Sequence, residues 1–332
     1  MTELTRRGIL SGAVAASAAT ALTPLAGNSA LAAAPPIGKQ ASSFYRYKVG
    51  TFEVTVASDG VVVNPLADTY VANAPKDAVN AALAANYLPT DKATHFYAPI
   101  VVNTGSKLVV IDTGLGPTVF QNSKGMAGQF HSNIAASGIA LDKIDTVIIS
   151  HFHGDHINGL LAAENKPAFP NAEIMVPAAE WKFWTDEGEF AKASEGLKGN
   201  FNNVKRVFGA LGNKVTQYEA GKEISPGITS VASYGHTIGH TSHIVSSGSQ
   251  RVLVQADITA GMAFLFMRNS DWQFAFDMNR PLAQETRRKL YDMAIAEKML
   301  VQSFHSPFPA VGYVEKDGNG YRWIPAPWNP TI

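Results

Sequence analysis

The stretch TVIISHFHGDH, residues 146–156, decides how this chain folds and what it binds. Its first half is a short, mostly apolar run typical of a buried strand, and it leads directly into three histidines and an aspartate. A strand that turns at such a segment can point alternate side chains at one spot. We therefore expect His151 and His153 to face one metal ion, and Asp155 and His156, beyond the glycine bend, to face another.

The composition restricts the chemistry of this segment, because the chain contains no cysteine. Disulfides and thiolate metal or redox sites are excluded, so a metal must be held by His, Asp or Glu. Imidazole and carboxylate ligands suit borderline cations such as zinc. The alternative is a surface run of polar residues. It is disfavoured because polar groups directly after an apolar strand would risk burial without partners.

Length and charge exclude other classes of protein. The 332 residues include 27 Lys and Arg and 27 Asp and Glu, so the formal charge is zero. Nucleic-acid binders usually carry a basic excess, and disordered chains combine high net charge with few aromatics. Here 46% of the residues are hydrophobic and 10% are aromatic, which predicts a globular protein with a sizeable core. The length suits one large α/β domain or two smaller ones.

Predicted strands and helices alternate along the chain, which favours an α/β layered domain. The Asp-Gly pair at 59–60 predicts a hairpin between strands at 52–57 and 61–63. A helix is expected from about 126 to 136, before Gly138. Further strands are expected at 100–102, 108–111, 146–150, 172–176, 228–233, 243–246, 252–255 and 300–304, and an amphipathic helix at 281–298.

The first residues predict an export signal. Residues 1–32 hold the pair Arg6 and Arg7, an uncharged run of small and apolar residues, and a small-x-small triplet at its end, which resembles a twin-arginine signal peptide. Residues 33–44 are expected to be flexible, and 45–332 to form the folded domain. The protein is then expected to be periplasmic or secreted. A stable membrane anchor is disfavoured, because Pro24 cuts the apolar run short of the ~20 residues that a span needs.

The HxHxDH pattern after a strand resembles the metallo-β-lactamase superfamily. The resemblance implies a single α/β domain folded as a four-layered αββα sandwich, with a metal site at one edge between the two sheets. It also implies ligands farther along the chain. The segment GHTIGHT at 235–241 is similar to the repeated GHT element of the family, whose first histidine is a ligand, here His236. VQAD at 254–257 resembles the segment with the bridging carboxylate, and His305 matches the final histidine.

This resemblance implies two divalent metal ions, expected to be Zn2+, and seven ligands. One ion would be bound by His151, His153 and His236, the other by Asp155, His156 and His305, and Asp257 would bridge them together with a water or hydroxide. Asp155 and Asp257 are the residues expected to act in catalysis.

Other polar residues near these motifs are expected to have secondary roles. Asp112, in the IDTG element at 111–114, resembles the family carboxylate that fixes the tautomer of a ligand histidine. Its alternative role is a simple turn. His240 is expected to be secondary rather than a ligand, and His95 and His131 to lie on the surface or at a pocket rim.

The implied chemistry is hydrolysis, because two bridged ions lower the pKa of water to about 7 and polarise a carbonyl or phosphoryl oxygen. A redox branch of the family carries Glu where His153 stands, and the antibiotic-hydrolysing branch generally lacks a carboxylate at the position of Asp257. Several segments, including 50–54 and 102–108, resemble methyl parathion hydrolase and its close relatives. Quorum-signal lactonases often carry Tyr where Ala260 stands, so the usual lactonase electrophile is missing.

The expected substrate is a small hydrophobic ester, lactone or phosphotriester. The alternatives are an acyl-homoserine lactonase, a β-lactamase-like amidohydrolase, and a non-hydrolytic metal-binding or redox protein of the same fold. We expect no nucleic-acid partner, and a homodimer stays open.

Two aromatic groups are interpreted as the substrate pocket. Phe264 and Phe266 belong to the aromatic-rich segment 261–278, and Trp181 and Trp184 are spaced to share one helical face. Core packing is the alternative for both groups.

Overall fold

The computed structural model describes residues 36–38 and 40–332. The predicted signal peptide at 1–32, and residues 33–35 and 39 of the predicted flexible segment, lie outside the described residues. Residues 41–332 form one compact unit. Its first strand begins at Phe44, one residue before the predicted start of the folded domain. No helix in the described part of the chain is long and apolar enough to cross a membrane.

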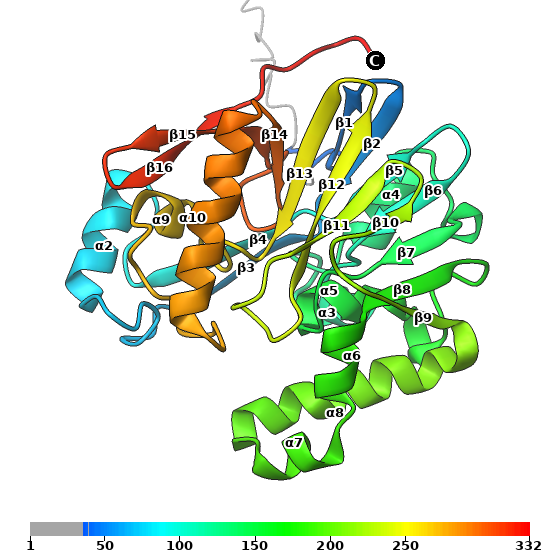
Figure 1. Ribbon diagram of the computed structural model, residues 1–332, viewed down its shortest axis with the longest axis horizontal. Helices are drawn as coiled ribbons and strands as arrows, with labels where there is room; N and C mark the ends of the chain where they lie inside the picture. The colour runs from blue at the N-terminus through cyan, green and yellow to red at the C-terminus, as the bar shows by residue number, and fades with distance from the viewer. Residues whose placement is uncertain (1–35, 39) are drawn as a thin grey trace, which may run out of the picture. The chain divides into compact units, whose positions relative to one another are not determined.

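Two seven-stranded sheets form the centre of this unit (Figure 1). The first sheet, in spatial order, consists of β1 (Phe44–Val49), β2 (Phe52–Ala57), β5 (Ile100–Asn103), β6 (Leu108–Ile111), β7 (Thr146–Ile148), β8 (Glu173–Pro177) and β9 (Val215–Tyr218). The second consists of β10 (Glu223–Ser225), β11 (Ile228–Ala232), β12 (Thr241–Ser247), β13 (Gln250–Ala256), β14 (Leu300–Ser303), β15 (Val311–Asp317) and β16 (Gly320–Pro325).

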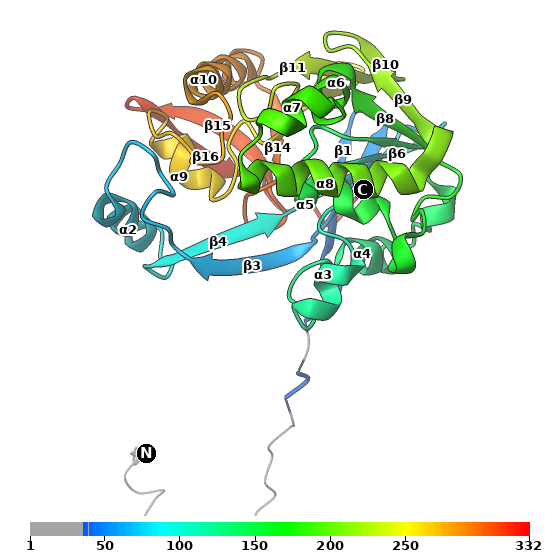
Figure 2. The same ribbon diagram turned by 90° about the horizontal axis from the view of Figure 1, so that it is seen from below.

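A two-stranded ribbon and a set of helices complete the unit. The ribbon pairs β3 (Gly60–Pro65) with β4 (Lys92–Tyr97) and is seen lengthwise in Figure 2. The helices are α2 (Lys76–Ala85), α3 (Pro117–Asn122), α4 (Phe130–Ala136), α5 (Gly154–Ile157), α6 (Ala178–Trp184), α7 (Glu187–Lys192), α8 (Glu195–Leu211), α9 (Ala263–Arg268) and α10 (Arg280–Ala296). The helix predicted from about residue 126 begins only at Phe130.

Apolar side chains alternate between the two faces of each central strand, and this alternation creates the layers. In β5, Val102 packs between the two sheets, whereas Val101 packs against the outer helices. In β13, Val252 faces the space between the sheets and Leu253 faces α10. Because each fully buried apolar side chain contributes about 1.5–3 kcal/mol, a strand that is apolar on both faces is stable only when both faces are covered. The predicted four-layered αββα sandwich is therefore confirmed.

The hairpin predicted at Asp59 and Gly60 is wrong. Strand β2 pairs with β1 and β5, whereas β3 leaves the first sheet and pairs with β4. Gly60 has φ of 92°, and a Cβ at this position would lie 2.1 Å from the carbonyl oxygen of Met126. The Asp59 carboxylate accepts hydrogen bonds from the backbone N–H groups of Leu115 and Phe130, both at 2.7 Å. The Asp-Gly pair thus fixes a long-range contact instead of a turn.

Both sheets deliver polar residues to one edge. Strands β6 and β7 are parallel, as are β13 and β14. Because carboxyl ends of parallel neighbours lie at the same edge of a sheet, the residues that follow them converge. Asp112 follows β6, His151 follows β7, Asp257 follows β13, and His305 follows β14.

Candidate metal centre

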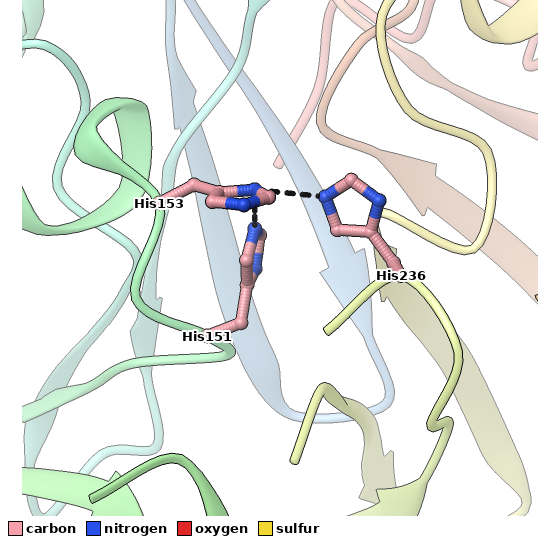
Figure 3. A group of neighbouring side chains, drawn as sticks. All are labelled: His151, His153 and His236. Carbon is pink, nitrogen blue, oxygen red and sulfur yellow. Dashed lines mark hydrogen bonds between the residues drawn. The ribbon is translucent and has the colours of Figure 1, made fainter. Parts of the chain in front are cut away.

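Three histidines from two loops form the first group of the candidate site. The Nε2 atom of His151 lies 3.1 Å from Nδ1 of His153, which in turn lies 2.9 Å from Nε2 of His236. Figure 3 shows the three rings converging, two from the segment after β7 and one from the loop after β11. The structure therefore brings together the three histidines expected to bind one ion.

The second group lies beside the first and contains Asp155, His156 and His305. An Asp155 carboxylate oxygen lies 3.6 Å from Nε2 of His156 and 3.4 Å from Nε2 of His305. Both histidines are buried, while the side chain of Asp155 keeps 22% of its surface exposed. Asp155 therefore faces solvent on one side of an otherwise enclosed group, in a position that a small molecule can reach.

Asp257 lies between the two groups, as expected for a bridging carboxylate. Its Oδ1 lies 3.3 Å from Nε2 of His156, and its Oδ2 lies 3.3 Å from Nε2 of His236 and 3.2 Å from Nε2 of His305. The preceding Ala256 has φ of 47°, a left-handed conformation that costs a non-glycine residue energy and that turns the chain sharply at the end of β13. This turn places the carboxylate among the histidines.

The donor atoms fit divalent cations. Nε2 of His156 and Oδ1 of Asp257 are buried and face each other at 3.3 Å, yet within the described residues neither atom forms a well-aligned hydrogen bond, which is costly unless a ligand satisfies them. A tetrahedral zinc ion with Zn–N bonds of about 2.0–2.1 Å separates two nitrogens by about 3.3 Å. The spacings of 2.9 and 3.1 Å in the first group are close to this value. Imidazoles and carboxylates are also the ligands that zinc takes in the absence of thiolates.

The electrostatics of the cluster call for positive charge at its centre. Burial opposes the charged form of His236, but hydrogen bonds and charge from Asp257 and Asp277 outweigh it and raise the pKa of this imidazole to about 9. Burial and the neighbouring His236 instead lower the pKa of His153 to about 3. In the absence of metal, the site therefore combines a protonated imidazole on His236 with a neutral one on His153. Divalent cations would neutralise the carboxylates and displace the proton.

Carboxylates and hydroxyls behind the histidines fix their tautomers. Asp112 Oδ2 lies 2.9 Å from Nδ1 of His156, so that Nδ1–H donates to the carboxylate and Nε2 points to the centre. The Ser150 hydroxyl donates to the same carboxylate at 2.8 Å and lies 3.0 Å from Nδ1 of His151. Asp112 therefore occupies the supporting position expected for it, and Ser150 relays this support to a second histidine.

Asp277 plays the same part for His236, and it was not predicted. Its Oδ1 lies 2.8 Å from Nδ1 of His236, which leaves Nε2 for the centre. The buried guanidinium of Arg287 lies 3.9 Å from the other carboxylate oxygen. Because Asp277 is separated from His236 by 41 residues and lies in a segment dominated by aromatics, no local sequence signal marks it. His305 is oriented differently, since its Nδ1 lies 2.8 Å from the carbonyl oxygen of Phe96.

His240 supports the site without contributing to either group. The backbone N–H of Asp257 donates to Nε2 of His240 at 2.9 Å. The proton of this imidazole therefore resides on Nδ1, which lies 2.8 Å from the Ser233 hydroxyl and 3.0 Å from the Ser233 carbonyl oxygen. The secondary role expected for His240 agrees with this arrangement.

Glu180 ties together the two loops that carry the first group, and it too was not predicted. This fully buried carboxylate accepts from the backbone N–H of Phe152 at 3.0 Å and from that of Gly239 at 2.7 Å. It also accepts from the indole N–H of Trp184 at 2.8 Å. A Cβ on Gly239 would lie 2.4 Å from the backbone nitrogen of Glu180, so the loop that carries His236 lies too close to α6 for any larger residue at this position.

A cavity of about 330 Å³ opens onto the candidate ligands. Its polar wall includes Asp155, Asp257 and His305, and its apolar wall includes Phe274 and Phe276. A cavity with one charged wall and one aromatic wall is typical of sites for small organic molecules. The remaining lining residues are His95, Tyr97, Leu115, His153, Gly154, Asn158, His236, Ala260 and Gly261.

The aromatic residues predicted to line the substrate pocket lie elsewhere. Phe266, in α9, is buried in the core that also contains residues of α2, and Phe264 is partly buried and packs against the same core. Trp181 and Trp184 line a separate cavity between α6, α7 and α8. Phe274 and Phe276, from the same aromatic segment as Phe264, line the cavity instead.

Comparisons with known proteins agree with this geometry. The family model described as the metallo-beta-lactamase superfamily matches residues 98–294. No curated protein sequence gives a significant match.

Solved structures share the fold over most of the chain. The hydrolase AbOPH of the beta lactamase superfamily has a TM-score of 0.79 and 25% identity, covering 88% of this chain and 100% of its own. The dizinc quorum-quenching lactonase AidC has a TM-score of 0.78 and 24% identity, covering 87% and 99%. A probable metal-dependent hydrolase from Staphylococcus aureus has a TM-score of 0.68 and 20% identity, covering 86% and 100%. Since the family model spans well over half of the chain, this protein belongs to the metallo-beta-lactamase superfamily.

Proposed function

We propose that this protein is an exported, dinuclear metal-dependent hydrolase of small hydrophobic esters, lactones or phosphotriesters. The observation that carries the proposal is the pair of ligand groups with Asp257 between them, within 3.3 Å of His156, His236 and His305. His151, His153 and His236 would hold one ion, and Asp155, His156 and His305 the other. Zn2+ is the proposed metal, because the ligands are nitrogen and oxygen atoms only.

Two such ions supply a low-pKa water nucleophile and Lewis acidity toward a carbonyl or phosphoryl oxygen. The protein side chains contribute position and environment. Asp257 holds the two groups together, while Asp155 reaches the cavity with its partly exposed carboxylate. Phe274 and Phe276 offer apolar surface for the hydrophobic part of a substrate. The leaving group would then depart toward the open side of the cavity.

A lactone is the first substrate to test. AidC is a lactonase whose structure holds an N-acyl homoserine product, and other structures of the same fold are N-acyl homoserine lactone hydrolases. AbOPH is a hydrolase, and the sequence resemblance to methyl parathion hydrolase and its relatives favours a phosphotriester as the second. His153 argues against the di-iron redox branch, and Asp257 argues against a true β-lactamase.

Export is proposed on the resemblance of residues 1–32 to a twin-arginine signal. Fusion of residues 1–40 to a reporter that functions only after export provides a direct check. Export that continues after replacement of both Arg6 and Arg7 by lysine would contradict a twin-arginine route. A homodimer is part of the proposal, and light scattering that gives the mass of a single chain would contradict it.

Purification without chelator, followed by metal analysis and assays, tests the hydrolase. We expect bound divalent metal together with turnover of an acyl-homoserine lactone, an aryl acetate or a phosphotriester. His151→Ala and Asp257→Ala should each lose metal and turnover. Asp271→Ala, at an exposed carboxylate paired with Arg288, should change neither. Bound iron with a redox signal and no hydrolysis of any substrate would overturn the proposal.

A further inference from the structure

Strand β4 presents two polar side chains to the cavity. His95 and Tyr97 are two residues apart in the strand, so they lie on the same face, and both line the cavity. The Tyr97 ring meets the ring of His305 edge-on, with 5.4 Å between their centroids. Neither residue belongs to the candidate ligand groups. This strand therefore adds two polar side chains to the lining of the cavity.

The tautomer of His95 is set by Tyr70. The backbone N–H of Met262 donates to the Tyr70 hydroxyl oxygen at 3.0 Å. The same hydroxyl lies 3.1 Å from Nε2 of His95. Among the described residues no other group accepts the hydroxyl proton, so the O–H donates to Nε2, and the proton of the neutral imidazole resides on Nδ1. Burial, with a smaller contribution from His305, lowers the pKa of His95 to about 4, which keeps the ring neutral.

Backbone packing holds Tyr70 in place. The ring is buried among Phe266 and Phe274, with centroid distances of 6.2 and 5.2 Å. Gly261 has φ of 63°, and a Cβ there would lie 2.3 Å from the Tyr70 hydroxyl oxygen. A glycine is therefore required for the hydroxyl to reach His95. Tyr70 is thus a rigid support rather than a mobile side chain.

The Nδ1–H of His95 is left for a molecule in the cavity. Within the described part of the chain it has no protein partner, yet it is absent from the fully buried unpaired atoms and so remains accessible. Ala260, three residues after Asp257, brings only a methyl group to the same cavity. Tyr97 also has a hydroxyl, but none of the described residues forms a hydrogen bond with it. A pre-oriented donor stabilises developing negative charge more effectively than one that must reorganise.

We propose that His95 is a catalytic hydrogen-bond donor, whose Nδ1–H binds the carbonyl or phosphoryl oxygen of the substrate, and that Tyr70 is its positioning residue. The inference rests on the proposed hydrolase function. As the nucleophile adds, the carbonyl or phosphoryl oxygen of the substrate gains negative charge. The hydrogen bond from Nδ1–H to that oxygen then becomes stronger, and the proton stays on Nδ1. The imidazole remains neutral throughout.

Three variants test this donor. His95→Leu should lower kcat by about 10²–10³-fold with a smaller change in KM, because removal of one such donor costs that much. His95→Asn places an amide N–H near the position of Nδ1 and should recover part of the loss. Tyr70→Phe frees the tautomer and should give an intermediate kcat. Metal content should match the wild type in every variant, and circular dichroism should confirm folding.

A second measurement does not depend on turnover. Long-range ¹H–¹⁵N correlation spectra of the wild-type protein should show His95 as the Nδ1–H tautomer, and the Tyr70→Phe variant should lose that preference. An Nε2–H tautomer in the wild type would overturn the inference.

The outcomes separate the two proposals. If the wild type hydrolyses no ester, lactone or phosphotriester, the proposed function fails and the catalytic role of His95 fails with it. If the wild type is active and His95→Leu retains full kcat, only the inference fails. A loss in Tyr97→Phe larger than that in His95→Leu would likewise overturn it, because the donor would then be the Tyr97 hydroxyl.

Discussion

The backbone N–H of Asp257 donates a hydrogen bond to Nε2 of His240 at 2.9 Å. His240 therefore supports Asp257, whose carboxylate lies between the two ligand groups. His240 lies only four residues after His236, yet its acceptor nitrogen is occupied by the protein itself. A nitrogen that accepts from a backbone N–H cannot also bind a metal ion. The site thus uses His240 to fix the backbone of Asp257.

Replacement of His240 separates support from ligation. His240→Leu leaves the Asp257 N–H and the Ser233 carbonyl without their partner, and we expect the free energy of unfolding to fall by about 1–3 kcal/mol. The side chain in His240→Gln offers an acceptor in place of Nε2, so the free energy of unfolding of this variant should fall less. Denaturant titration measures both. Metal analysis should still find both ions in His240→Gln, and loss of one whole ion would show that His240 is a ligand.

Removal of the Asp277 charge should weaken metal binding. Its Oδ1 lies 2.8 Å from Nδ1 of His236 and holds the tautomer whose Nε2 faces the centre. Loss of such a supporting carboxylate typically costs about 10–100-fold in metal affinity. We expect this loss for Asp277→Asn in competition with a fluorescent chelator. Asp271→Asn, at an exposed carboxylate, is the control, and equal affinities in the two variants would contradict the assigned role.

Glu180 should matter for both stability and metal binding. A glutamine at this position has one carbonyl oxygen, so it cannot accept simultaneously from the N–H groups of Phe152 and Gly239, which bind different oxygens. We expect Glu180→Gln to lower the free energy of unfolding by about 1–3 kcal/mol and to loosen the first histidine group. Thermal unfolding with and without zinc provides the measurement. Glu187→Gln, at an exposed glutamate, should behave as wild type.

The metal-free protein should lose stability on the alkaline side. The pKa of His236 is raised to about 9 in the folded chain, against about 6.5 when unfolded. The folded state therefore binds this proton more tightly, and the contribution is complete below pH of about 6.5 and lost as the pH rises through about 9. Its upper bound is about 3 kcal/mol.

Chelator-treated wild type and His236→Gln, unfolded in urea at several pH values, isolate this contribution from other groups. The stability difference between them should shrink between pH of about 6.5 and 9. A difference that stays constant across this range would show that His236 does not hold the proton.

The convergence of the candidate ligands could be predicted because they follow strands directly. His151, Asp257 and His305 each come within three residues of a strand end, and parallel neighbours bring such residues to one edge. The α/β class was predictable because strands and helices alternate along the chain. The four-layered αββα arrangement was expected from the superfamily resemblance. The superfamily resemblance is confirmed, while the narrower resemblance to methyl parathion hydrolase stays a prediction.

The supporting residues could not be predicted, because they depend on contacts between distant segments. Asp277 reaches His236 across 41 residues, and Glu180 reaches Gly239 across 59. Neither carries a local motif. The aromatic segment shows a related limit, since composition alone does not reveal that Phe264 faces the core while Phe276 faces the cavity. The direction of the Phe264 ring depends on where the short helix α9 begins and ends, and Phe276 lies beyond that helix.

Metal stoichiometry measured in parallel with turnover tests the dinuclear hydrolase most directly. Protein stripped with a chelator is titrated with zinc, and elemental analysis and lactone hydrolysis are followed on the same samples. We expect binding to saturate at two ions per chain, and turnover to be absent in the stripped protein and to reach its maximum only when both ions are bound. Undiminished turnover by protein freed of metal, or saturation at a single ion with full activity, would contradict a dinuclear centre built on Asp257.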